Sequence, residues 1–188
     1  MPRPFYLKSV KDRPYKNLQL ELLRKLLNDE IHLLRGSNIV QSRLFSEMLI
    51  ETMNKYCNRS IKLMEAIIEL INLAKSVKES AERGEDLGLN SDEMAFYDAL
   101  CAHGDAKNVM GEKKLAAISL DLVKQIRKSV TIDWNRKASV RAQMRVKIKR
   151  LLRKHGYPPD KNEEATETVI EQAEIVYQNW DFEENGSV

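Results

Sequence analysis

Glycine and proline are scarce in this chain, and long apolar runs are missing from it. Only 7 glycines and 5 prolines occur among 188 residues, which argues against a β-sandwich, a β-barrel or a disordered tail. No apolar run approaches the roughly 18 residues that a membrane-spanning helix needs, and the amino terminus lacks the apolar centre of a signal peptide. These absences favour a soluble, cytoplasmic, all-α protein without a membrane partner.

Groups that hold metals or attack substrates are also few. Cys57 and Cys101 lie far apart and match no metal or redox spacing, so we expect both to be reduced. The sequence contains no Gly-rich phosphate-binding loop. The triplet 112–114 resembles the ExK half of a restriction-nuclease motif, but it is predicted to begin an amphipathic helix, whereas that motif needs its carboxylates on strands around a metal ion. We expect the three histidines to be surface residues: His32, His103 and His155. The sequence predicts no catalytic residue, no metal site and no cofactor on this chain.

Helical periodicity organises the amino-terminal half. Apolar residues recur at spacings of three and four from Tyr15 to Gly36 and again over 39–81, where Arg83-Gly84 is the predicted end. An unbroken helix over 39–81 would extend roughly 65 Å, longer than a compact domain of this mass is wide. We therefore expect either a projecting arm or a break near Cys57-Asn58-Arg59, with the chain reversing at Gly36 into a long antiparallel helical hairpin.

Shorter helices are predicted in the second half. The first is capped by Asn90 or Ser91, and the four together are expected over 91–102, 112–128, 136–155 and 161–180. The resulting organisation is a 1–14 extended leader, a 15–84 hairpin, an 85–181 compact helical subdomain and a 182–188 tail, although 15–181 can equally form one domain. The fold class is all-α, ending in a basic/acidic helix pair.

The distribution of charge is more informative than its near-balanced total of +3. No acidic residue lies between Asp133 and Asp160, an interval with nine basic residues. A cationic helix face suits sequence-independent phosphate contacts. The alternative is pairing with the acidic helix that follows, which carries five glutamates between 163 and 174. Candidate contacts to nucleic acid or an acidic partner are Arg136, Arg141, Arg145, Lys149 and Arg153.

The same region carries a family resemblance. Its features are the segment 130–134 (VTIDW), Val140-Arg141-Ala142, Gly156-Tyr157-Pro158-Pro159 and Gln172-Ala173-Glu174. Further matches lie upstream, at 28–31 (NDEI), 45–49 (FSEML) and 93–100 (EMAFYDAL). Over roughly residues 14–180, the chain resembles the carboxyl-terminal helical domain of type I restriction endonuclease R subunits.

The resemblance implies a partner set and a role. R subunits of this family combine a nuclease, two ATP-hydrolysing motor lobes and a helical carboxyl-terminal domain, and only the last corresponds to this chain. The implied role is docking of the motor onto the methyltransferase core, made of modification and specificity subunits, with a DNA contact. Two other hypotheses remain open: a free-standing nucleic-acid-binding module centred on 136–154, and a helical scaffold that dimerises through the hairpin.

Overall fold

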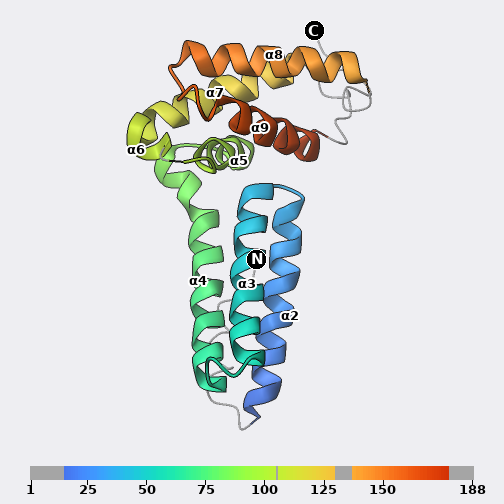
Figure 1. The fold of residues 1–188 in the computed structure, drawn as a ribbon, viewed down its shortest axis with the longest axis vertical. Coiled ribbons are helices and arrows are strands. Elements are labelled where there is room, and N and C mark those ends of the chain that lie inside the picture. The colour runs from blue at the N-terminus through green and yellow to red at the C-terminus, as the bar shows by residue number, and fades with distance from the viewer. Residues whose placement is uncertain (1–14, 105, 130–136, 178–188) are drawn as a thin grey trace. The chain divides into compact units, whose positions relative to one another are not determined.

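The structure is a computed structural model that describes residues 15–104, 106–129 and 137–177. Every regular element in these ranges is a helix, and eight helices follow one another along the chain (Figure 1). The predicted all-α class is therefore confirmed. None of the described helices is both long and apolar enough to cross a membrane.

The chain divides into two compact units, each with its own hydrophobic core. Among the described residues, unit 1 comprises 15–35 and 41–83, and unit 2 comprises 36–40 and 84–177. Unit 2 thus takes five residues from between the two stretches of unit 1. The two units are described separately below.

Unit 1 is built from three helices that lie side by side (Figure 1). They are α2 (Lys16–Arg35), α3 (Ile39–Cys57) and α4 (Leu63–Leu87). The stripe at Leu20, Leu23, Leu27 and Ile31 is almost fully buried, as its helical spacing predicts. Of the two alternatives for 39–81, a projecting arm or a break near Cys57, the structure has the break: α3 ends at Cys57, and Arg59 adopts a left-handed φ of 58° before α4 begins.

The predicted end of α4 at Arg83-Gly84 is wrong. The helix continues through Gly84 to Leu87, and Gly88 (φ 65°) provides the left-handed position that terminates it. Gly84 has a different role, since a Cβ there would lie 2.9 Å from the carbonyl oxygen of Leu89. The amide of Leu89 also donates to the carbonyl of Gly84. Glycine at 84 therefore permits close approach of the returning chain.

Unit 2 packs four longer helices and one short helix around a single core. They are α5 (Ser91–Cys101), α6 (Ala106–Met110), α7 (Glu112–Arg127), α8 (Ala138–Lys154) and α9 (Asn162–Val176), of which α6 was not predicted. Asn90 begins α5 with the predicted cap, accepting from the amide of Glu93 at 3.0 Å while the Glu93 carboxylate accepts from the amide of Asn90 at 2.8 Å. Helix α5 is the central element and is buried at every position from 94 to 100.

Segment 36–40 is held in unit 2 by buried polar side chains. The Gln172 side chain, fully buried on α9, accepts from the Ile39 amide at 3.0 Å and donates to the Ser37 carbonyl at 2.6 Å. Asn38 donates to the Asp98 carboxylate at 2.8 Å, and Asp98 is only 4% exposed. Because unpaired buried polar groups are costly, these bonds fix the segment in place.

We expect Gln172→Leu to lower the free energy of unfolding by about 2 kcal/mol, because it leaves the Ile39 amide and the Ser37 carbonyl unpaired. Chemical denaturation followed by circular dichroism measures the loss. Glu79→Gln, an exposed change on α4, is the control and should stay within about 0.5 kcal/mol of the parent. An unchanged stability for Gln172→Leu would contradict this role.

Candidate functional site

Four of the five predicted basic residues lie on α8, whose rotation is fixed by three buried apolar side chains. Met144, Ile148 and Leu152 are at most 1% exposed, so the basic residues occupy the remaining circumference of the helix. Helix α9 packs against one flank of α8 and α7 against another. The two flanks differ in their charge partners. Of the five candidates, Arg136 lies outside the described residues.

The flank of α8 toward α9 is neutralised by glutamates. Arg141 Nε lies 3.0 Å from Glu174 Oε1, and Arg145 donates to Glu167 at 2.8 Å. Lys149 pairs with Glu163 in the same way. Three of the predicted contact residues therefore have intramolecular partners, which is the alternative that the acidic helix suggested. Arg153, the fifth candidate, is exposed.

The pairing lowers the pKa of Glu163. The hydrogen bond from Lys149 is the largest cause, burial opposes it, and the nearby charges of Lys149, Arg145 and Arg153 lower the pKa further. Glu163 is therefore fully charged at neutral pH. We call this surface of Arg141, Arg145 and Lys149 with their glutamates the paired face.

The opposite flank of α8, toward α7, forms a cationic groove of about 450 Å³. Five basic side chains line it, and all five are exposed: Lys124, Lys128, Lys147, Arg150 and Lys154. A single carboxylate, Asp121, lies among them and contacts the His155 ring at 3.1 Å. We call this surface the α7–α8 groove.

Within the groove the cations have little to neutralise them. Lys147 donates to the Ser129 hydroxyl at 3.0 Å, a neutral partner. In the parts of the chain that the structure describes, none of the other four basic side chains forms an ion pair. The groove thus combines concave shape with positive charge that the described residues leave unpaired, which focuses an attractive field on anions.

Sequence reasoning named none of the five basic residues of this groove as a contact. Lys124 and Lys128 lie on and just beyond α7 and were not among the predicted contacts. Lys147, Arg150 and Lys154 belong to the basic run but lie on a different flank from Arg141, Arg145 and Lys149. The sequence did contain a signal for Lys124 and Lys128, because the carboxyl-terminal turn of the predicted 112–128 helix is rich in basic residues. The sequence could not show that this turn lies beside the 136–155 helix, because that depends on tertiary packing.

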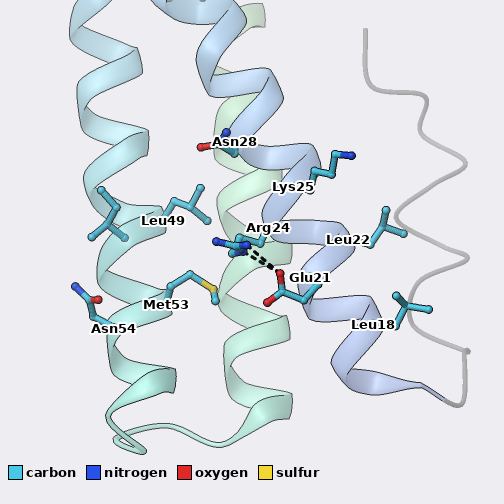
Figure 2. Close-up of a pocket in the computed structure, with 10 residues that line it drawn as sticks. Leu18, Glu21, Leu22, Arg24, Lys25, Asn28, Leu49, Met53 and Asn54 are labelled. Atoms are coloured by element: carbon cyan, nitrogen blue, oxygen red, sulfur yellow. Dashed lines mark hydrogen bonds and ion pairs between the residues drawn. The ribbon is translucent and has the colours of Figure 1, made fainter.

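A second surface of interest lies in unit 1, where α2 and α3 border an apolar groove (Figure 2). Leu18, Leu22, Leu49, Ile50 and Met53 are among the residues that line it. Figure 2 shows Met53 extending from α3 toward the ion pair between Glu21 and Arg24 on α2, which is 3.0 Å long. Leu18 is 65% and Ile50 59% exposed. We call this surface the α2–α3 groove.

Groups suited to metal or nucleophilic chemistry are scattered. Among the residues that the structure describes, no three His, Cys, Asp or Glu side chains cluster as metal ligands do. His103 contacts Thr168 at 2.6 Å and His155 contacts Asp121, so each ring has a structural partner. Glu112 opens α7 and pairs with Lys107 at 2.7 Å. Trp134 and Trp180 fall outside the described residues.

Comparison with known proteins decides the family. A family model described as "Type I restriction enzyme HindI endonuclease subunit-like, C-terminal" matches residues 4–179. The chain belongs to this family. The type I restriction enzyme HindI endonuclease subunit of Haemophilus influenzae is 39% identical over 171 residues, covering 91% of this chain. The resemblance noted in the sequence is confirmed.

The HindI-type relatives are much longer than the present chain. A putative type I restriction enzyme MjaIXP endonuclease subunit of Methanocaldococcus jannaschii is 32% identical over 152 residues, or 80% of this chain. The matches span only 16% of the Haemophilus protein and 14% of the Methanocaldococcus protein. No solved structure matches the chain. The described helices therefore give the architecture of a HindI-type carboxyl-terminal region.

The lowered pKa of Glu163 predicts a pH-dependent stability difference. A carboxylate that releases its proton more readily when folded stabilises the fold above its ordinary pKa, and this contribution is lost as the pH falls through the lowered value. We expect Glu163→Gln to lower the Tm by about 1–2 °C at neutral pH, as is usual for one exposed pair, and to converge with the parent in acid. A Tm difference that grew on acidification would contradict the pairing.

Proposed function

We propose that this chain docks the ATP-dependent translocase and endonuclease of a type I restriction enzyme onto its methyltransferase core. The proposal includes a sequence-independent contact with DNA. The rest of the R subunit and the modification and specificity subunits are the proposed partners. Family membership supports the assignment to the endonuclease subunit, and the α2–α3 groove supports a docking role.

The observation that carries the docking proposal is the exposure of Leu18 and Ile50 at the α2–α3 groove. Single exposed apolar residues are common on protein surfaces, but neighbouring ones that line a groove are typical of protein-binding sites. The charged residues at this groove, Glu21, Arg24 and Lys25, add polar groups of the kind that accompany apolar contacts in protein interfaces. We therefore propose that the methyltransferase core docks on this surface.

The test is co-elution of the chain with the modification and specificity subunits of its own system. Ile50→Glu places a charge in the proposed interface, and we expect it to weaken the complex at least about tenfold, as a central apolar contact does. Ile68→Glu is the matched control: Ile68 is 51% exposed on α4 and does not line the groove. It should bind as the parent does.

Three outcomes would count against docking. The first is a parent chain that fails to co-elute at mild salt. In the second, Ile50→Glu binds as tightly as the parent. In the third, Ile68→Glu is the more damaging substitution, which would move the interface to α4. Sedimentation that showed a stable dimer, lost in Ile50→Glu, would instead favour the scaffold hypothesis.

A further inference from the structure

We infer that the α7–α8 groove, and not the paired face of α8, is the surface that binds the phosphate backbone of duplex DNA. The inference deepens the DNA contact in the proposed function by naming its residues, and it rests on that proposal for the identity of the ligand. Its five basic residues are those defined above: Lys124, Lys128, Lys147, Arg150 and Lys154.

The first argument is availability. On the paired face, each of Arg141, Arg145 and Lys149 already has a glutamate partner, so binding a phosphate there means breaking an existing ion pair. In the groove, the one carboxylate among the described lining residues, Asp121, contacts His155 at 3.1 Å. Phosphates that enter the groove meet cations whose charge the described part of the protein leaves uncompensated, and binding releases counterions from the DNA.

The second argument is spacing. Lys147, Arg150 and Lys154 follow one another at intervals of three and four, which places them on one side of α8 over roughly 10 Å. Lys124 and Lys128 are separated by about 6 Å along α7. One DNA strand presents a phosphate about every 3.4 Å along the duplex axis. The two rows of cations therefore suit a short run of successive phosphates.

The third argument is self-repulsion. Like charges four residues apart on a helix destabilise it, and the groove holds two such pairs, Lys124 with Lys128 and Arg150 with Lys154. The carboxyl-terminal dipole of α7 offsets part of this repulsion near Lys128. A bound polyanion would relieve the rest. A surface that keeps unfavourable charge in a concave site is typical of a binding site.

The groove chemistry favours a duplex over a single strand. Proteins that bind single strands combine basic grooves with aromatic side chains on which bases stack. The residues that line this groove are charged or polar apart from Leu151, with no Phe, Tyr or Trp among them, and the His155 ring contacts Asp121. Such a surface can contact the backbone while leaving the bases paired, and it predicts binding without sequence preference.

The experiment compares two variants of the 188-residue chain that carry the same net charge. Lys124→Gln/Arg150→Gln/Lys154→Gln removes three of the five groove cations, and Arg141→Gln/Arg145→Gln/Lys149→Gln removes the three cations of the paired face. Each takes the formal net charge from +3 to 0, so a difference between them reports position and not total charge. Binding to a short duplex of arbitrary sequence is measured by fluorescence anisotropy over a range of salt concentrations.

For the parent, five phosphate contacts predict a log–log salt slope of about −4.5, or roughly a 500-fold loss of affinity between 50 and 200 mM salt. The groove variant should have a slope near −1.8 and bind at least about tenfold more weakly at low salt. The paired-face variant should keep the parental slope. Without DNA, the groove variant should have an unchanged or higher Tm, because repulsion has been removed.

Several results would overturn the inference. These are a flat salt slope for the parent, an equal or larger effect of the paired-face variant, or tighter binding of a single strand of the same length. Binding of polyglutamate in preference to the duplex would show that the groove takes an acidic protein. Because the titration needs no methyltransferase subunit, its failure leaves the docking proposal standing, and failed co-elution leaves the groove result standing.

Discussion

The three ion pairs between α8 and α9 are the constraint on which the functional interpretation depends. Three glutamates of α9 neutralise three basic side chains of α8, and the apolar stripe at Met144, Ile148 and Leu152 fixes the rotation that makes this register possible. Exposed or half-exposed pairs of this kind contribute little stability individually. Their main consequence concerns anion binding. The basic side chains on the flank toward α9 are occupied by glutamates, whereas those on the flank toward α7 can bind external anions.

Local features of the fold were predictable from sequence, and features that depend on tertiary contact were not. The capping box at Asn90 and Glu93 lies within four residues, so the sequence limited the cap to Asn90 or Ser91 and the structure has Asn90. The break after Cys57 was one of the two alternatives that the length of the 39–81 pattern suggested, the other being a projecting arm. At Arg83-Gly84 the local end signal failed, because a second glycine four residues on terminates the helix and Gly84 is needed for contact with Leu89. A glycine in the sequence does not by itself show whether it ends a helix, as Gly88 does, or permits close approach of another backbone segment, as Gly84 does.

The candidate site shows the same division. The run of basic residues and the acidic helix after it are visible in the sequence, and so was the choice between phosphate contact and internal pairing. Which side chains take which role depends on the helices that flank α8. Lys124 and Lys128 became part of the site only because α7 packs beside α8. Helical periodicity identifies the buried stripe of each helix but not the neighbour that covers each flank.

The placement of residues 36–40 has a consequence for dissecting this region. The backbone enters unit 2 for five residues between α2 and the body of α3, returns to unit 1, and enters unit 2 again at Gly84. No single cut of the polypeptide therefore yields two complete halves. A fragment beginning at Gly84 would lack the segment whose backbone Gln172 binds, and it would expose core residues that Val40 partly covers. Recombination between members of this family should therefore exchange both units together, because their chain segments alternate along the sequence.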